Sequence, residues 1–369
     1  MKGVTKERGV FLVLGLVVLV GSLFIGVYID SNSVYAEDSS QHSIFLPFVS
    51  KDAGFEGTPT PPPTRSIVYK VYGLDFGPYT EEGQNPEYGT VIGEGQIREL
   101  LTVIAPYTRW VRTFGSTHGL ENMGRIGHEY GLKVAAGAWL GRDLDANEEQ
   151  ISSLIEIAGA GEADVLVVGS EVLLRGDLTE SQLIDYINQV KQASPETPVT
   201  TADVYDVLLA HPAVIDAVDV VFVNYYPCWV GVDVENAVAW VHQKHQQVVE
   251  ASQGKPIVVS ETGWPSDGTQ RGDAVPSTKN AAFYFLNFVS WARASDVDYF
   301  YFEAFDEPWK SEDSWGPHWG VWDSDRNMKP GLQAVFDGET MEDNWSGEDI
   351  PGGPGDPAIE FTYVPPYGE

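Results

Sequence analysis

Two glutamates in this chain directly follow short runs of apolar, mostly β-branched residues. Glu171 stands at the end of the run 163–170, and Glu261 at the end of the run 255–260. Runs without polar alternation are typical of strands that are buried on both faces of a parallel sheet. When such strands form a barrel, the residues at their carboxyl ends carry the chemistry. We therefore expect both carboxyl groups at a barrel mouth, where two facing acids are the minimal apparatus for hydrolysing a glycosidic bond.

This chemistry requires the two acids to differ in protonation. In a retaining enzyme the carboxyl groups lie about 5 to 5.5 Å apart, so that one attacks the anomeric carbon while the other protonates the leaving oxygen. A neighbouring carboxylate and partial burial raise the pKa of the acid and keep its proton in place. Once the glycosyl-enzyme has formed, the nucleophile is no longer charged. The acid then ionises and activates the incoming water.

Strand-like and helix-like segments alternate along the chain between the two ends of the expected domain. The expected strands are 67–76, 110–114, 132–139, 164–168, 199–204, 218–224, 256–260 and 297–305. The expected helices are 94–104, 120–130, 147–157, 180–192, 207–217, 234–251, 278–294 and 329–336.

Eight strands that alternate with eight helices are the pattern of a (β/α)8 TIM barrel, an α/β fold. In this pattern Glu171 ends the fourth strand and Glu261 the seventh. A doubly wound open sheet shares the alternation, but no Gly-x-Gly-x-x-Gly sequence follows the first strand, which weighs against a dinucleotide-binding fold. Thr179, Asp233 and Ser277 stand where helix N-caps are expected.

The segments on either side of the barrel differ from it in composition. Residues 1–36 place basic residues before an uncharged apolar run at 10–28. This predicts a cleaved signal peptide or an uncleaved membrane anchor, and either leaves the rest of the chain outside the cytoplasm. Residues 37–65 are polar and then proline-rich, which predicts an extended linker. We expect the barrel domain at 66–338 and an irregular, acidic, Gly/Pro-rich tail at 339–369.

The charge of the chain restricts its partners. Its 369 residues include 54 acidic and 22 basic ones, which gives a formal net charge of -32 and a sequence pI near 4.3. A field of this sign repels nucleic acids, whereas a neutral polysaccharide meets no such repulsion. The single cysteine, Cys228, excludes an intrachain disulfide. We expect a monomer that acts on a neutral polysaccharide.

The histidines give no indication of a metal site. The seven of them show no spacing typical of metal ligands, and we expect neither a metal nor an organic cofactor. His242 and His245 fall on a predicted helix away from the barrel mouth. We expect both of these side chains to be solvated.

Three motifs stand at or near the ends of the expected fourth, seventh and eighth strands. They are Val-Gly-Ser-Glu-Val at 168–172, Ser-Glu-Thr-Gly-Trp-Pro-Ser at 260–266 and Phe-Glu-Ala-Phe-Asp-Glu-Pro-Trp-Lys at 302–310. Together they resemble glycoside hydrolase family 17, the β-1,3-glucanase family, over the whole expected barrel. The resemblance implies an exported hydrolase that cleaves β-1,3-glucan by double displacement. It implies Glu171 as the general acid/base and Glu261 as the nucleophile.

One position departs from the pattern of the barrel clan to which this family belongs. The clan has Asn immediately before the acid/base, where the amide binds the 2-hydroxyl of the sugar, and this chain has Ser170. A hydroxyl is shorter and has one donor hydrogen instead of two. The contact is therefore lost, bridged by water or replaced by another group.

The resemblance also indicates residues that line the cleft. Tyr225 and Tyr226 end the expected sixth strand, where the family has an aromatic hydroxyl close to the nucleophile, and one of them is expected to bind Glu261. Glu307 and Lys310 match acidic and basic positions beside the catalytic pair. A lysine there favours ionised carboxylates and binds sugar hydroxyls, and a plain ion pair at the rim is the alternative.

Other candidates follow from residue type and position. Indole rings stack on the apolar faces of sugars, so some of the tryptophans are expected to bind substrate and the others to pack in the core. Asp75, Arg112 and Asp203 lie on or after expected strands and are candidates for sugar binding or for support of the pair. Alternation along the eighth strand is expected to turn Glu303 away from the cleft. The tryptophans in question are Trp139, Trp264, Trp309, Trp315 and Trp319.

Three other activities are compatible with the same residues. A transglycosylase resolves the intermediate with a sugar in place of water, and the shape of the acceptor site decides between them. A hydrolase of the same clan that acts on another β-glycan is a second alternative. A carbohydrate-binding module without catalysis is the third, and the presence of both glutamates argues against it.

Overall fold

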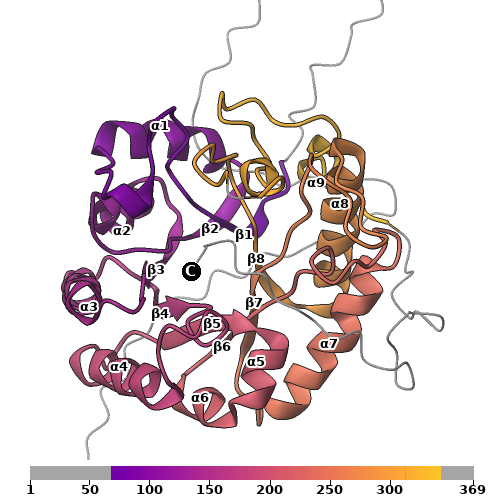
Figure 1. The fold of residues 1–369 in the computed structure, drawn as a ribbon. Helices are drawn as coiled ribbons and strands as arrows, with labels where there is room; N and C mark the ends of the chain where they lie inside the picture. The colour runs from indigo at the N-terminus through magenta and orange to yellow at the C-terminus, as the bar shows by residue number, and fades with distance from the viewer. Residues whose placement is uncertain (1–67, 312, 342–369) are drawn as a thin grey trace, which may run out of the picture. The chain divides into compact units, whose positions relative to one another are not determined.

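Eight parallel strands close into one barrel, in the order in which they occur in the chain (Figure 1). The computed structural model describes residues 68–311 and 313–341. Each strand pairs with the next one, and β8 pairs with β1, which confirms the expected (β/α)8 barrel. The strands are β1 (Val71–Asp75), β2 (Thr108–Arg112), β3 (Lys133–Ala138), β4 (Val165–Ser170), β5 (Val199–Val204), β6 (Val221–Asn224), β7 (Ile257–Glu261) and β8 (Asp298–Tyr301).

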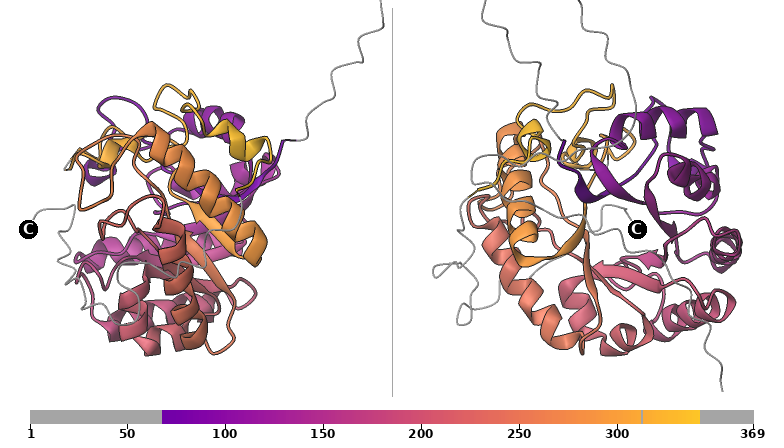
Figure 2. Two further views of the ribbon diagram at one scale, coloured as in Figure 1. Left: turned by 90° about the vertical axis from the view of Figure 1, so that its right-hand side faces the viewer. Right: turned by 180° about the vertical axis from the view of Figure 1, so that it is seen from behind.

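The α-helices surround the strands, as the views from the side and from behind show (Figure 2). Thr179 begins α4 with a full capping box, and the Ser277 hydroxyl accepts from the backbone of α8, so both expected caps are confirmed. The third expected cap was wrong, because α7 begins after Asn236 and not after Asp233. The helices are α1 (Glu94–Ile104), α2 (Met123–Glu129), α3 (Leu144–Gly159), α4 (Glu180–Ala193), α5 (Tyr205–Ala210), α6 (Pro212–Ala217), α7 (Ala237–Ala251), α8 (Thr278–Ser295) and α9 (Gln333–Phe336).

Two expected elements differ from the observed ones. The helix expected at 207–217 is split into α5 and α6, because Pro212 lacks an N–H and His211 before it leaves the helical region, at φ -122° and ψ 62°. The strand expected at 297–305 ends early, at Tyr301 in β8. Its last residues instead bond the segment around Trp319, for example through the Glu303 N–H and the Trp319 carbonyl.

Apolar side chains fill the interior of the barrel as well as the layer between strands and helices. Gly73 on β1 leaves room for Phe300, because a Cβ added there would lie 2.4 Å from the phenyl ring. The polar residues of the barrel mouth therefore pack on a layer of apolar side chains that fills the barrel interior. The interior cluster consists of Ala135, Val167, Ala202, Val220, Phe222, Val258 and Phe300.

Several sequence predictions concern residues that the structure does not describe. The signal or anchor at 1–36, the linker at 37–65 and most of the tail at 339–369 lie outside the described residues. Among the residues that are described, no helix has the length and apolarity needed to cross a membrane.

Candidate active site

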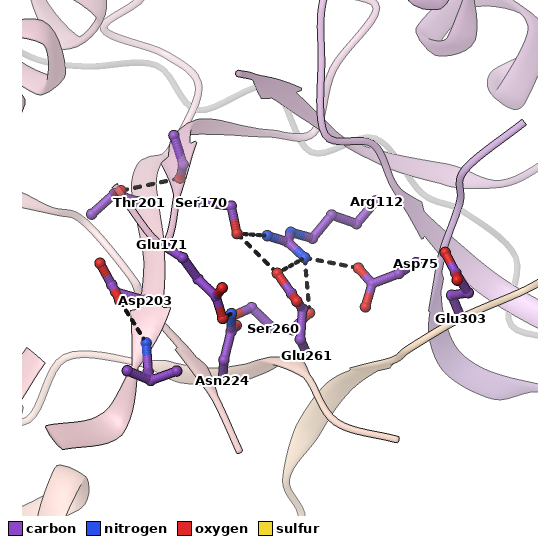
Figure 3. A network of polar contacts seen from close by, with 12 residues as sticks. Asp75, Arg112, Ser170, Glu171, Thr201, Asp203, Asn224, Ser260, Glu261 and Glu303 are labelled. Atoms are coloured by element: carbon purple, nitrogen blue, oxygen red, sulfur yellow. Dashed lines mark hydrogen bonds and ion pairs between the residues drawn. The ribbon is translucent and has the colours of Figure 1, made fainter. Parts of the chain in front are cut away.

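Arg112 at the end of β2 is the centre of a buried polar network at the barrel mouth (Figure 3). Its Nη1 donates to Asp75 Oδ1 and to Glu261 Oε1, both at 2.9 Å, and to the Ser260 carbonyl at 3.1 Å. Its Nη2 donates to Ser170 Oγ at 3.0 Å. One guanidinium thus joins the ends of β1, β2, β4 and β7.

Three side chains donate to the Glu261 carboxylate. Oε1 accepts from Arg112 and from Ser170 Oγ, at 2.9 Å each, and Oε2 accepts from the Tyr226 hydroxyl at 2.9 Å. The carboxylate is 5% exposed, so it meets the barrel mouth through a small opening. Donors on both oxygens stabilise the ionised form and fix its orientation. Three donors of this kind suit a carboxylate that acts as a nucleophile.

Glu171 lies in a different electrostatic environment. It is partly exposed, and its Oε1 accepts from the Asn224 amide at 2.9 Å. Removal from bulk water raises the pKa of Glu171 to about 8, and the negative charges of Glu261 and Asp203 act in the same direction. Glu171 therefore retains a proton at neutral pH beside an ionised Glu261. Two carboxyl groups in such different environments are candidates for an acid and a nucleophile.

A local irregularity at the end of β4 brings two consecutive side chains into the site. The pairing of β4 with β5 shifts between Val167 and Ser170, and Gly169 and Glu171 both have positive φ, at 79° and 55°. Regular alternation would turn one of Ser170 and Glu171 out of the barrel. The bulge lets Ser170 reach Glu261 while Glu171 reaches Asn224.

Asn224 was not expected from the sequence. It ends β6, is fully buried, donates to Glu171 and accepts from the Ser260 hydroxyl at 2.6 Å. The signal available in the sequence was a lone polar residue at the end of an apolar strand, immediately before the Tyr225-Tyr226 pair. The structure assigns it a bridging position between Glu171 and the strand that bears Glu261.

Of the two adjacent tyrosines, only Tyr226 reaches the site. The Tyr225 side chain is fully buried, and its hydroxyl lies 3.3 Å from Nδ1 of His245 behind the barrel wall. Consecutive residues of a strand end point to opposite faces, so Tyr225 cannot line the cleft as we had predicted. The expected solvation of His245 was also wrong, because the residue is buried. This burial lowers its pKa to about 4.

Lys310, Glu303 and Glu307 form a second buried charged cluster. Lys310 Nζ lies 2.7 Å from both oxygens of Glu303 and 2.7 Å from Glu307 Oε2. The other oxygen of Glu307 accepts from the Tyr79 N–H. Burial opposes the charge of Lys310, but the two carboxyl groups outweigh it and raise its pKa. Glu303 and Glu307 are buried and Lys310 is partly exposed, so the contacts form a three-residue network and not the plain ion pair that is the alternative.

Arg175 supports the loop that follows Glu171. Its Nη1 donates to the Ser170 carbonyl and its Nη2 to the Leu140 carbonyl, while Nε donates to Asp177. The ring of Trp139 packs over this guanidinium, with its centroid 4.3 Å from Cζ. Trp139 remains 38% exposed, so one indole face is available to a ligand.

Two further candidates occupy structural positions and not the substrate cleft. Trp264 is 1% exposed, packs on Tyr284 and donates from Nε1 to the Val275 carbonyl, so its ring is not available for sugar stacking. Asp203 is buried as well. Its carboxylate accepts from the backbone N–H groups of Leu173, Leu174 and Val204, which holds the turn after Glu171.

The remaining tryptophans of the sequence prediction pack mainly on one another and on nearby rings. Trp315 and Trp319 are buried, and Trp319 contacts Tyr226 edge to face. Trp309 is partly buried against Tyr79.

Within the described ranges, no group of three or more His, Cys, Asp or Glu side chains is arranged to hold a metal ion.

Known proteins are similar to this chain in sequence and in fold. The family model of the BtgE/BtgC glycoside hydrolase domain matches residues 73–320. Glucan 1,3-beta-glucosidase of Candida albicans is 29% identical over 290 residues, which cover 71% of this chain and 92% of the relative. The enzyme of the same name from Saccharomyces cerevisiae is 32% identical over 275 residues, which cover 67% of this chain and 88% of the relative.

A solved structure extends the comparison to three dimensions. The glycoside hydrolase family 17 beta-1,3-glucanosyltransferase from Rhizomucor miehei is 33% identical, has a TM-score of 0.64 and covers 71% of this chain and 96% of its own. An active-site mutant of that protein has been solved in complex with laminaritriose. Because the family model spans most of the barrel, whose fourth and seventh strands each end in a glutamate, this chain belongs to glycoside hydrolase family 17.

Proposed function

We propose that this protein is an exported retaining glycoside hydrolase that cleaves β-1,3-glucan through a glycosyl-enzyme intermediate. Its relatives from Candida albicans and Saccharomyces cerevisiae are named glucan 1,3-beta-glucosidases. The observation that carries the mechanism is the contrast between Glu261, which accepts three hydrogen bonds from side chains, and Glu171, whose raised pKa preserves a proton. This contrast supports Glu261 as the nucleophile and Glu171 as the acid/base.

In the first step a bond forms between the Glu261 carboxylate and the anomeric carbon as the glycosidic C–O bond breaks. The proton of Glu171 moves to the leaving oxygen, so the first sugar product departs neutral. Asn224 occupies Oε1 of Glu171 as a donor, which leaves Oε2 to carry the proton. The hydrogen bonds from Arg112 and Tyr226 keep the Glu261 carboxylate in position as it loses its negative charge to the new bond.

In the second step water replaces the first product. The loss of the Glu261 charge removes one cause of the raised pKa of Glu171, so the ionised form of Glu171 is favoured. Glu171 then takes a proton from water, and the oxygen attacks the anomeric carbon and releases Glu261. Two inversions give net retention of configuration.

Several side chains around the catalytic pair are candidates for binding substrate or for supporting the nucleophile. Ser170 Oγ already donates to Glu261 and accepts from Arg112, so it supports the nucleophile directly. We assign to Trp139 a stacking contact with a glucose unit, because its indole is exposed and held by Arg175. We propose that the partly exposed Lys310 binds sugar hydroxyl groups, while the buried Glu307 holds it in position.

Transglycosylation is the second candidate, and one comparison favours it. The solved structure that shares 33% of its residues with this chain is named a glucanosyltransferase. The same two glutamates serve both reactions, and they differ in whether water or a sugar hydroxyl attacks the glycosyl-enzyme.

The segments outside the barrel fit this assignment. We propose residues 1–36 as an export signal or anchor, 37–65 as a linker and 339–369 as a tail, with the catalytic domain at 66–338 as a monomer outside the cytoplasm. A chain shortened to begin at Arg65 should be soluble and active. If it fails while a chain that begins at Glu37 folds well, the linker segment packs on the barrel.

The decisive experiment is product analysis on a linear β-1,3-glucan, with the anomeric configuration followed by NMR. Retention supports double displacement, and products longer than the substrate indicate transfer. Glu171→Ala and Glu261→Ala should each reduce turnover at least about 10³-fold without unfolding the barrel. Azide should restore activity to the Glu261→Ala variant with an inverted product, and near-normal turnover by either variant would refute its role.

A further inference from the structure

Asp75 shares one nitrogen of Arg112 with the candidate nucleophile. Its Oδ1 and Glu261 Oε1 both accept from Nη1 of Arg112, at 2.9 Å each (Figure 3). Asp75 and Arg112 are both 0% exposed. The second oxygen of Asp75, Oδ2, is buried and has no hydrogen-bond partner among the described residues.

The balance of charge in this trio depends on the protonation of Asp75. If Asp75 and Glu261 are both ionised, the buried group of Asp75, Arg112 and Glu261 carries a net negative charge. Oδ2 of Asp75 is then a charged oxygen without a donor, which is unfavourable in a buried site. If Asp75 holds a proton, the trio is neutral and the Arg112 charge is directed to Glu261. Complete burial and an unpartnered oxygen favour this second state.

The charged groups that face Asp75 come from three neighbouring elements. They are Arg112 on β2, Glu261 on β7 and Lys310 after β8. Burial raises the pKa of Asp75 to about 8, and Glu261 raises it further, whereas Arg112 and Lys310 oppose the shift. Both the burial of Asp75 and the charges around it therefore predict that its carboxyl group is protonated at neutral or acidic pH.

The orientation of Arg112 depends on the contacts of its terminal nitrogens. Its Nε has no hydrogen-bond partner in the described part of the chain, so it does not fix the plane of the guanidinium. Asp75 is the contact on the side of Nη1 that faces away from β7 and Glu261. Without an acceptor there, Arg112 keeps its bonds to Glu261, the Ser260 carbonyl and Ser170 but loses one of the contacts that fix the plane of its guanidinium, so its two terminal nitrogens are held less tightly.

We propose that Asp75 is a positioning residue that stays protonated while Glu261 is ionised, and that it locks Arg112 so that both terminal nitrogens serve the nucleophile and Ser170. The proposal rests on the proposed role of Glu261.

Two substitutions separate this role from a simple buried ion pair. Asp75→Asn keeps an acceptor oxygen for Arg112 and mimics the protonated acid, whereas Asp75→Ala removes the acceptor. At pH 6 on β-1,3-glucan, we expect Asp75→Ala to lower kcat about 30- to 100-fold with KM nearly unchanged, since small misplacements of a nucleophile have effects of this size. Asp75→Asn should stay within about 3-fold of the wild type.

The matched control is Glu129→Gln, the same change from carboxyl to amide on the exposed surface of α2, where Glu129 pairs with Arg98. It should leave kcat and KM unaltered. If Asp75→Asn loses as much activity as Asp75→Ala, Asp75 acts as an anion and the proposal is wrong. If Asp75→Ala keeps full activity, Asp75 does not position Arg112.

A second measurement does not depend on activity. In the full chain labelled with ¹³C at the aspartate carboxyl carbons, the resonance that Asp75→Asn removes should have the shift of a protonated acid at pH 6. It should change to the shift of a carboxylate above about pH 8. A carboxylate shift at pH 6 overturns the proposal even if Asp75→Ala fails to fold. Absence of hydrolysis by the wild type would instead refute the proposed function and leave this readout intact.

Discussion

At the scale of single residues, the proposed role of Glu171 as the acid predicts how the reaction depends on pH. Its pKa is raised to about 8, and it must be protonated to act as the acid. We therefore expect kcat/KM on unactivated glucan to be constant at neutral pH and to fall as the pH rises through about 8. A glycoside with a strongly acidic leaving group needs no proton from the enzyme, so its alkaline decline should be much weaker. An equal decline for both substrates would assign the ionisation to another group, such as Asp75 or Asp203.

Ser170 offers a second test at this scale. Its hydroxyl donates to an anionic Glu261, and the loss of a hydrogen bond to a charged group has an effect of about 1.5 to 3 kcal/mol. Ser170→Ala should accordingly reduce kcat by about 10- to 150-fold. A 2-deoxy substrate shows whether Ser170 also binds the 2-hydroxyl. If wild type and variant lose the same factor with it, position 170 does not read that hydroxyl.

Position at the ends of apolar strands predicted that Glu171 and Glu261 meet at the barrel mouth, and the family resemblance predicted a tyrosine hydroxyl beside Glu261. The same reasoning could not separate Tyr225 from Tyr226, since a shift of one residue exchanges the inner and outer faces. Trp264 was misassigned for a related reason. An indole suits a sugar face and a core equally well, and only the packing against Tyr284 decides between them.

At the scale of elements, the end of β4 depends on Gly169. Its φ of 79° is unfavourable for other residues, and an added Cβ would lie 2.5 Å from the Val172 side chain. We expect Gly169→Ala to destabilise the fold by about 2 to 4 kcal/mol and to reduce turnover by displacing Glu171. The control is Gly176→Ala in the following loop, where φ is 64° and a Cβ meets nothing within 4 Å.

Urea unfolding and steady-state kinetics measure both variants. Strain alone should make Gly176→Ala less stable by about 1 kcal/mol with normal turnover. If the two variants behave alike, the close contact with Val172 is unimportant and the bulge tolerates a side chain.

Periodicity predicted the order of strands and helices, but it failed where local chemistry interrupts a pattern. Pro212 divides an apolar stretch whose spacing is otherwise helical. After Tyr301 the sequence still has the pattern of a strand, but part of the backbone there bonds the segment around Trp319. Such partners lie far along the chain, so no local pattern identifies them.

At the scale of the whole molecule, buried acids tie stability to pH. The folded-state pKa values of Asp75, Glu171 and Asp203 are raised to about 8, 8 and 7. Above about pH 4 the folded state keeps protons that the unfolded chain releases, so their stabilisation is complete in acid and is lost as the pH rises toward 8. Repulsion within a chain of net charge -32 acts in the same direction.

We therefore expect the Tm of the barrel to fall between pH 5 and pH 8.5, as calorimetry would measure. The double variant Asp75→Asn/Asp203→Asn should show a smaller fall, because two of the proton-retaining groups are gone. A Tm that rises over this interval would mean that these carboxyl groups are ionised in the folded state.

The contacts of Arg112 also have a consequence for the order of folding events. Arg112 joins Asp75, Ser170 and Glu261, which are 37, 58 and 149 positions away along the chain. Contacts of such long range form only after much of the chain has condensed, whereas helices form within a few residues of sequence. Because Glu261 lies on the seventh strand, the candidate active site is complete only when the barrel has closed. During refolding, glucan cleavage should therefore return later than the circular dichroism signal of the helices. The rate at which cleavage returns would then measure the rate of barrel closure.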